Sequence, residues 1–305
     1  MGVLMLFLDG VGIGTADASV NPFFQAELPS FRSLLGGELP GLNLPFLQNG
    51  TASLIPLDPN LGIEGLPQSG TGQTALFTGV NAPQLIGKHF GPYPYSTLRP
   101  VVRERNIFRQ LIDAGKRVYF ANAYPQRFFD YFKDKQTRLT VTTLSCSYCD
   151  MPLHQATELE KGVAISADIT NAGWPRMGYS HILRIEPAEA GRRLVRLCAE
   201  YDFVLFEYWR TDKAGHSEKM SEAVESLEAF DGMLCGILES IDTARTLLLI
   251  TSDHGNIEDM STKVHTRNPV PVMLFGCRHN EVAKALQEKP DLTSVTPALM
   301  QYFVT

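Results

Sequence analysis

Positively charged residues are in the minority in this sequence. Its 305 residues carry 27 Lys and Arg against 33 Asp and Glu, which gives a formal net charge of -6 at pH 7. We therefore expect no basic surface of the kind that binds nucleic acid or an anionic membrane. A negative net charge still permits phosphate binding where the positive charge is local, as it is on metal ions.

Long apolar runs and a leader pattern are also missing. The apolar run at 3–8 has the length of a strand, well short of the roughly 20 residues that span a membrane. The first residues lack the basic start and the small-residue cleavage site of a signal peptide. Cysteines number only five, and an odd count in a chain of this size favours reduced thiols. We expect a cytoplasmic protein without a membrane partner.

What the sequence does contain is a set of apolar runs of strand length. Those at 3–8, 203–208 and 247–250 are continuous rather than alternating, which is typical of buried strands in parallel sheets. Helices are predicted between and after them, at 107–115, 187–200, about 219–238 and 293–303. The pattern predicts an α/β fold around a mostly parallel sheet. The run at 270–275 follows Pro269 and contains Pro271, which predicts an edge strand.

The middle of the chain is less regular than its two ends. Residues 126–184 contain an aromatic and basic stretch but no sustained helical or strand period. We expect 1–125 and 185–305 to form the α/β core, and 126–184 to form a small cap or lid. The single C-x-x-C pair, Cys146 and Cys149, is too little for a closed zinc site, which needs four ligands.

Acidic and histidine residues follow directly on three of the predicted strands. Asp9 follows the first strand, and Asp253 and His254 follow the one at 247–250. Asp212 and His216 come after another, four residues apart, so that a helical turn would place them on one face. The carboxyl ends of parallel strands meet at one edge of the sheet, where ligands bind. Because carboxylates and imidazoles bind zinc and manganese, the pattern predicts a metal site there.

A polar turn before a short predicted helix supplies hydroxyl groups. A phosphate-binding P-loop would need Lys where Thr71 stands, although Gly65 and Gly70 fit its glycines. A nucleophile elbow around Ser69 would need glycine where Pro67 stands. The glycines after the first strand also miss the dinucleotide-binding spacing. The remaining interpretations are a capped helix start, or a Ser69 or Thr71 nucleophile that a metal activates.

Taken in order, these motifs resemble the alkaline phosphatase superfamily. They are Asp9-Gly10, Ser69 before a glycine-containing helix start, Asp212-x-x-x-His216, Asp253-His254-Gly255-Asn256, and His265 in a His-Thr-Arg-Asn-Pro-Val-Pro block. The residues of these motifs are most similar to those of the cofactor-independent phosphoglycerate mutase and phosphopentomutase families. The resemblance covers roughly the first 80 and the last 110 residues. It implies an alkaline-phosphatase-like three-layer sandwich with a small cap or lid insertion.

The resemblance also implies roles for individual residues. One metal would be held by Asp212, His216 and His265, and the other by Asp9, Asp253 and His254 with the Ser69 hydroxyl bound beside it. Ser69 is the implied nucleophile and Thr71 the alternative. Gln73 stands where the mutases have histidine, and their arginine-rich substrate motifs are not evident. Arg210, Lys263 and Arg267 lie near ligands in sequence and are candidates for substrate contacts.

The chemistry follows from that set of residues. Two divalent ions, zinc or manganese, would lower the pKa of the serine hydroxyl, as metals lower that of water from about 15.7 to about 7. They would also attract an anionic phosphoryl group. We expect a two-metal phosphohydrolase or phosphotransferase that acts on a small phosphate ester, with hydrolysis favoured because the cap is small. The alternatives are a phosphomutase of the phosphoglycerate mutase or phosphopentomutase type, and a metal-binding protein without turnover. The Cys/Ser-x-Pro-x-Arg pattern of sulfatases is absent.

Overall fold

A computed structural model describes residues 1–133 and 138–304, and it has a seven-stranded sheet at its centre, in the order β2-β3-β9-β8-β1-β7-β4. The strands are β1 (Gly2–Leu8), β2 (Leu47–Gln48), β3 (Ala52–Leu57), β4 (Val118–Phe120), β7 (Phe203–Tyr208), β8 (Thr246–Thr251) and β9 (Val270–Gly276). The neighbours β8/β1, β1/β7 and β7/β4 are parallel, while β9 and β2 run against their neighbours. The predicted α/β fold is confirmed, with a mixed and mostly parallel sheet.

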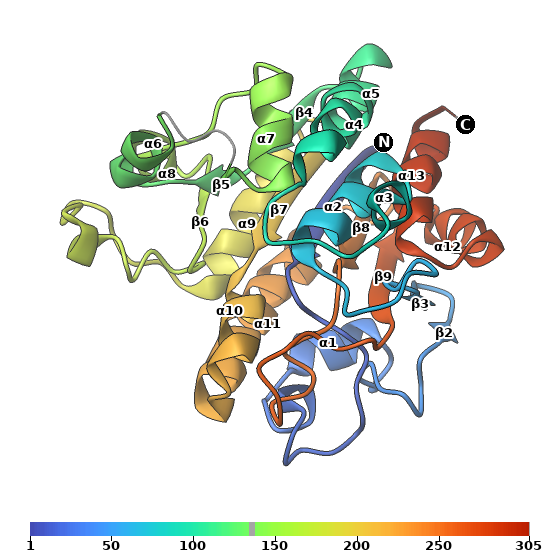
Figure 1. Ribbon diagram of the computed structural model, residues 1–305. Coiled ribbons are helices and arrows are strands. Elements are labelled where there is room, and N and C mark those ends of the chain that lie inside the picture. The colour runs from blue at the N-terminus through green and yellow to red at the C-terminus, as the bar shows by residue number, and fades with distance from the viewer. Residues whose placement is uncertain (134–137, 305) are drawn as a thin grey trace.

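Helices cover both faces of the sheet, which makes three layers (Figure 1). One face is covered by α1 (Pro29–Leu34), α9 (Pro187–Leu197) and α11 (Met220–Ser240). The other is covered by α2 (Ser69–Thr78), α4 (Arg99–Arg105), α5 (Ile107–Asp113), α7 (Val141–Tyr148), α12 (His279–Glu288) and α13 (Val295–Val304). Among the described residues, no helix is both long enough and apolar enough to cross a membrane.

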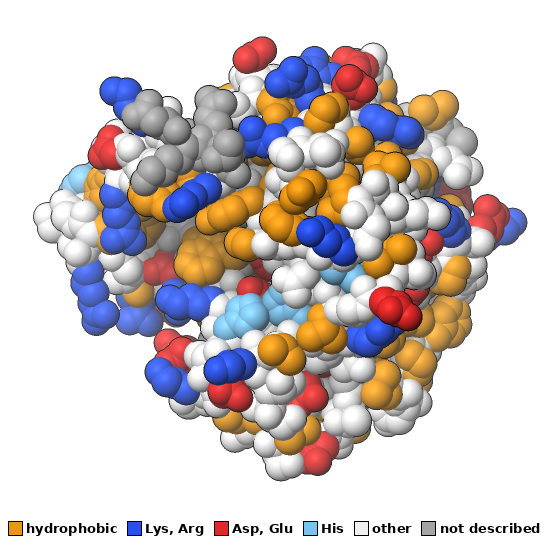
Figure 2. Space-filling view, in the orientation of Figure 1, with side chains coloured by type: hydrophobic (Ala, Val, Ile, Leu, Met, Phe, Trp, Pro, Cys, Tyr) orange, Lys and Arg blue, Asp and Glu red, His pale blue; other side chains and the backbone are white. Residues whose placement is uncertain are grey.

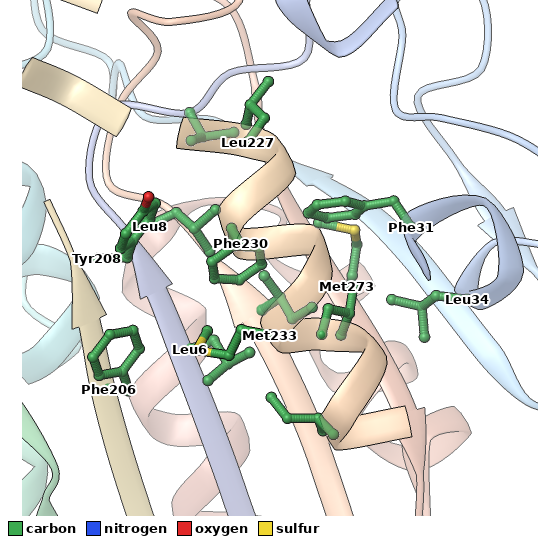
Figure 3. Packing of buried hydrophobic residues seen from close by; sticks show 14 of the residues in the cluster. Leu6, Leu8, Phe31, Leu34, Phe206, Tyr208, Leu227, Phe230, Met233 and Met273 are labelled. Atoms are coloured by element: carbon green, nitrogen blue, oxygen red, sulfur yellow. The ribbon is translucent and has the colours of Figure 1, made fainter. Parts of the chain in front are cut away.

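The two helical layers explain why the central strands are apolar throughout. Successive side chains of a strand point to opposite faces of the sheet. In β1, Leu4 and Leu6 therefore pack against one helical layer, and Val3 and Met5 against the other. Figure 3 shows the first of these clusters, where Phe230 of α11 lies over the sheet close to Leu6. A strand buried on both sides has no polar face to display, and the continuous run follows from that.

The prediction of an edge strand at 270–275 was wrong. β9 lies inside the sheet, between β8 and β3. Pro271 is tolerated there because it pairs in register with Pro56 of β3, another residue without an N–H. On its other side, the pairing with β8 ends at Thr251 and Val272, so Pro271 lies beyond it. Proline is excluded only where its backbone N–H would have to donate to a neighbouring strand. Pro271 has to donate neither to β3 nor to β8.

The segment 126–184, apart from 134–137 outside the described residues, divides between two surroundings. Helix α7 packs against α2, α4 and α5, and its Cys146 is buried in their apolar cluster. The rest lies to one side of the sheet in Figure 1, where Trp174 and Leu159 form a small separate cluster. Its elements are α6 (Gln126–Phe132), α8 (Ala156–Glu160) and β6 (Ile165–Ser166), which pairs with β5 (Asn122–Ala123). All five cysteines are free thiols.

Candidate metal centre

The predicted ligands come together at the carboxyl ends of the three central strands. Asp9 directly follows β1, and Asp253 and His254 lie just after β8. After β7 comes α10 (Arg210–Ser217), which carries Asp212 and His216 one helical turn apart. Because β8, β1 and β7 are adjacent and parallel, residues that follow them meet at one edge of the sheet.

The first group of ligand atoms consists of Asp212, His216 and His265. One atom from each lies within 4.8 Å of the others. The Nε2 atom of His216 is 3.3 Å from Oδ2 of Asp212, and the Nε2 atom of His265 is 3.5 Å from its Oδ1. The two Nε2 atoms are themselves only 3.2 Å apart. This group is the one that the sequence predicts for the first metal.

Hydrogen bonds from the Nδ1 atoms of His216 and His265 fix the orientation of the two rings. Nδ1 of His216 donates to the carbonyl of Lys263 at 2.7 Å, and Nδ1 of His265 donates to that of Pro67 at 2.7 Å. In the neutral rings the Nε2 lone pairs then face each other and Asp212. Lone pairs in that arrangement repel unless a cation lies between them. Histidines that bind metals are held by their other nitrogen in this way.

The second group of ligand atoms consists of Asp9, Asp212 and His254, again within 4.8 Å of one another. Asp212 therefore belongs to both groups, where the sequence predicted Asp253 in the second. Asp253 is fully buried, and its Oδ2 lies 3.5 Å from Nε2 of His254. Oδ1 of Asp9 and Oδ2 of Asp253 are buried atoms that accept no hydrogen bond. Buried oxygens of this kind are costly without a partner and fit metal ligands.

The electrostatics of the protein groups point the same way. Burial, together with Asp253 and Asp212, raises the pKa of Asp9 to about 7. Burial also raises the pKa of Asp253 to about 6. Burial opposes a charge on His254, but the carboxylates of Asp253 and Asp9 outweigh it and raise that pKa to about 10. The site is short of positive charge, and divalent cations would supply it.

The two candidate nucleophiles have different surroundings. Ser69 is the first residue of α2, and its Oγ lies 3.0 Å from Nε2 of His254. The hydroxyl of Thr71 instead donates to the carbonyl of Gln68 at 3.1 Å and accepts the N–H of Phe90 at 3.2 Å. Ser69 thus faces the cluster, while the hydroxyl of Thr71 is occupied by the backbone.

A buried glutamate that sequence reasoning missed ties the ligand-bearing loops together. Glu258 accepts the N–H groups of Gly12 at 2.8 Å and Asn256 at 2.7 Å on one oxygen. Its other oxygen accepts the Thr266 hydroxyl and the Asn268 amide. One carboxylate thereby holds the loop after β1, the turn after β8 and the segment that follows His265. It lies in a loop, away from any predicted strand end, and gave no sequence signal.

Further contacts orient the aspartates. The amide of Gln73 donates to Oδ2 of Asp9 at 3.3 Å, and that of Asn256 donates to Oδ1 of Asp212 at 2.6 Å. Gly10, in the loop just after β1, has a φ of +70°. A Cβ atom on this residue would lie 2.6 Å from Oδ1 of Asp212. Glycine at this position lets the two aspartates approach each other.

The predicted substrate residues separate into two kinds. Arg210 lines a cavity of about 850 Å³ that reaches Asp9. Lys263 and Arg267 are exposed and are not among the described residues that line this cavity. The backbone carbonyl of Lys263 accepts the hydrogen bond from Nδ1 of His216. In Figure 2, histidine side chains (pale blue) are exposed on this face, beside a hollow bordered by hydrophobic atoms (orange).

Comparisons with known proteins agree with this geometry. Residues 184–305 match the model of the Metalloenzyme superfamily. A 2,3-bisphosphoglycerate-independent phosphoglycerate mutase from Pyrococcus abyssi is 35% identical over 85 residues, which are 28% of this chain and 20% of that protein. The one from Agrobacterium fabrum is 33% identical over 122 residues, 37% of this chain and 23% of that protein. The matches thus span only about a fifth of the length of these curated relatives.

Two solved structures resemble the whole fold. The alkaline phosphatase from the Antarctic bacterium TAB5 matches with a TM-score of 0.56 at 12% identity, over 98% of this chain and 96% of that one. The phosphoglycerate mutase from Leishmania mexicana matches with a TM-score of 0.51 at 12% identity, over 98% and 94%. The chain has an alkaline-phosphatase-like fold with a candidate metal centre. Its residues 184–305 are similar to the Metalloenzyme superfamily, and the sequence relatives are phosphoglycerate mutases.

Proposed function

We propose that this protein is a two-metal phosphohydrolase or phosphotransferase that acts on a small phosphate ester through Ser69. The observation that carries the proposal is the orientation of His216 and His265. Both rings donate Nδ1–H to backbone carbonyls and turn their Nε2 atoms, 3.2 Å apart, toward Asp212. Imidazoles held in this way, with their free nitrogens turned toward a shared carboxylate, fit the ligands of a divalent cation.

The ligand sets proposed for the two ions use every acid and imidazole of the cluster. Asp212, His216 and His265 would hold one ion, and Asp9, Asp253 and His254 the other, with zinc and manganese both suited to these donors. Because Asp212 belongs to both groups of ligand atoms, it would be available to either ion. When bound, the ions supply the positive charge that attracts the phosphoryl group and lowers the pKa of the nearby serine hydroxyl.

Ser69 is placed for attack on that phosphoryl group. The N-terminus of α2, where Ser69 lies, favours an anion because its first backbone N–H groups carry partial positive charge. The Ser69 hydroxyl would give its proton to water, the Oγ–phosphorus bond would form as the ester oxygen–phosphorus bond breaks, and the leaving alcohol would take a proton from water. Water then attacks the phosphoserine and releases inorganic phosphate and the free hydroxyl. A second alcohol in place of that water would make the reaction a transfer.

We assign catalysis and the cap to the segments whose boundaries the sequence predicted. Residues 1–125 and 185–305 would supply the catalytic core, and 126–184 the cap beside the cluster. Helix α7 lies within that segment but packs on the core, so the cap is smaller than the segment. A small cap leaves little to retain a dephosphorylated product for a second transfer, which favours hydrolysis.

A phosphomutase is the second candidate, since the curated sequence relatives are phosphoglycerate mutases. The two functions differ in their product. Phosphorus NMR of a reaction with 3-phosphoglycerate or ribose 5-phosphate distinguishes an isomeric ester from inorganic phosphate. Appearance of the isomer before any free phosphate would replace hydrolysis by mutase action.

The proposal is tested with the protein loaded with zinc or manganese and assayed on phosphomonoesters and diesters. Ser69→Ala is expected to lower kcat by at least about 10³-fold while both ions stay bound. Thr71→Val, which removes the alternative hydroxyl, is expected to retain activity if the variant folds. Absence of turnover in the wild type with two ions bound would leave the metal-binding protein without turnover as the function. Activity that survives in Ser69→Ala but not in Thr71→Val would assign the nucleophile to Thr71.

A further inference from the structure

A cavity of about 850 Å³ opens from the candidate metal centre toward residues 123–132 and 138–177. Its described lining includes Asp9, the first predicted ligand, together with Glu207 of β7. The volume lies within the range of roughly 300–1,000 Å³ that small-molecule sites occupy. A phosphate ester whose phosphoryl group is at Ser69 would therefore have its alcohol part in this cavity. The chemistry of the walls then indicates the kind of alcohol.

The walls are predominantly aromatic. Seven of the 22 described lining residues are Phe, Tyr or Trp, whereas these residues make up only 10% of the whole chain. The rings of Tyr124 and Phe128 lie 4.2 Å apart between centroids and form one side. The chain has only two tryptophans, and both Trp174 and Trp209 line the cavity. Trp209 is 40% exposed even though it directly precedes the helix that carries Asp212.

The polar groups of the wall are largely engaged with each other. The carboxylate of Asp168 accepts the Ser166 hydroxyl and the N–H groups of Asn171, at 2.9 Å, and Gly173, at 2.6 Å. The indole N–H of Trp174 donates to Ser166 Oγ at 2.8 Å. Thr140 and Thr143 are hydrogen-bonded to one another through their hydroxyls. These hydroxyl and carboxylate groups are thus already hydrogen-bonded. Apart from the charged Arg127, Arg138 and Arg210, the aromatic rings supply much of the surface that an alcohol would contact.

We propose that the substrate is a phosphate ester whose alcohol carries a planar aromatic ring, and that this ring binds between Phe128 and Trp209. The inference rests on the proposed function for the position of the phosphoryl group. Aromatic rings prefer edge-to-face and offset-stacked contacts, which walls of this composition offer to a flat ligand. A flexible aliphatic alcohol of the same size gains apolar burial but not these contacts.

The test compares benzyl, cyclohexylmethyl and ethyl phosphate. All three leaving groups are unactivated primary alcohols, so differences in kcat/KM report on the cavity rather than on leaving-group strength. Binding is measured separately with the corresponding benzyl, cyclohexylmethyl and ethyl phosphonates, which are not hydrolysed. Because both tryptophans line the cavity, intrinsic fluorescence reports ligand binding without turnover. Phe128→Ala and Trp209→Ala alter the wall, and Phe46→Ala, an exposed ring elsewhere, is the matched control.

The benzyl compounds are expected to exceed the ethyl ones by at least about tenfold in both measurements, equivalent to about 1.4 kcal/mol. They should exceed the cyclohexylmethyl compounds by about threefold or more, and each wall variant should remove most of the preference while Phe46→Ala keeps it. Equal binding of benzyl and ethyl phosphonate would overturn the inference, as would a preference retained in both wall variants. A benzyl preference in binding without turnover of any ester would support the cavity assignment and contradict the proposed function. Turnover of all three esters at one rate would do the reverse.

Discussion

The metal cluster and the aromatic cavity lie side by side and share Asp9, yet they are built in opposite ways. The cluster takes its side chains from the ends of strands that are buried on both faces, and Asp253 and His254 are fully buried. The cavity takes its walls from α6 and the irregular residues around Trp174, and Trp209 remains well exposed. A rigid sheet edge can hold charges at fixed distances, while appended segments can vary in shape at little cost to the core. Chemistry and selectivity are thus assigned to different parts of the chain.

The largest effect is expected from a substitution of Asp212, which should affect the candidate metal centre but not the cavity. Asp212→Asn should weaken metal binding by at least about 100-fold and abolish turnover, because this residue belongs to both ligand groups. The cavity should be unaffected, so the fluorescence response to benzyl alcohol should match that of the wild type.

His216→Ala provides the graded comparison, since His216 belongs to only one group. Metal analysis should find about one ion per chain in this variant, against two in the wild type. Two ions retained in Asp212→Asn would show that the site does not depend on the shared carboxylate.

Removal of metal should destabilise the core more than any single wall substitution. Without cations, the carboxylates of Asp9, Asp212 and Asp253 converge in a site where burial disfavours their charge. Loss of ions bound at 100 to 1,000 times their Kd costs roughly 3–4 kcal/mol. We expect calorimetry to show a Tm lower by roughly 5–10 °C after chelation. A Tm that stays constant once metal loss has been verified would contradict a two-ion cluster.

Glu258 tests whether the cluster depends on its loops being held. In Glu258→Gln, an NH₂ group would replace one of two oxygens that each accept two hydrogen bonds. The new NH₂ group would face groups that themselves donate hydrogen bonds, and it would be buried without an acceptor. This should lower the free energy of unfolding by about 2–4 kcal/mol in urea titrations. Glu281→Gln is the control, because Glu281 is exposed and surface ion pairs such as its pair with Arg278 contribute little to stability. Equal effects of the two substitutions would mean that Glu258 is not a structural tie.

The smallest expected effect concerns Glu207, where cluster and cavity meet. Burial raises its pKa from 4.5 to about 8, so between those pH values the folded protein binds a proton that the unfolded chain has lost. Stability should therefore fall as pH rises through this window. In the chelated protein, Glu207→Gln should be more stable than the wild type at pH 8 by about 1–3 kcal/mol, and near equal at pH 4.5. A pH-independent difference in urea titrations would show that Glu207 is not protonated when folded.

The same contrast explains how much the sequence alone could predict. The strand at 3–8 and the position of Asp9 after it were predictable, because burial on both faces leaves an uninterrupted apolar run that ends at a polar residue. The helical turn that pairs Asp212 with His216 followed from their spacing. Pro271 misled because the tolerance for proline depends on which neighbour each residue pairs with, and that is a tertiary property.

Other features had no local pattern to read. Glu258 gathers four donors from three segments, and no spacing in the chain anticipates that arrangement. The cavity walls come from residues as distant as Tyr93 and Trp209, so their common lining appears only once the chain is folded. The position of Asp212 in both ligand groups also depends on packing, since it requires β1 and β7 to be neighbours.

The central claim is that this sheet edge holds two divalent ions beside Ser69. The most direct test is a crystal structure of the manganese-loaded protein, with diffraction measured on both sides of the manganese absorption edge. The account predicts two anomalous peaks, one among Asp212, His216 and His265, and one among Asp9, Asp253 and His254. No peak at these residues, or a single peak at full loading, would contradict it.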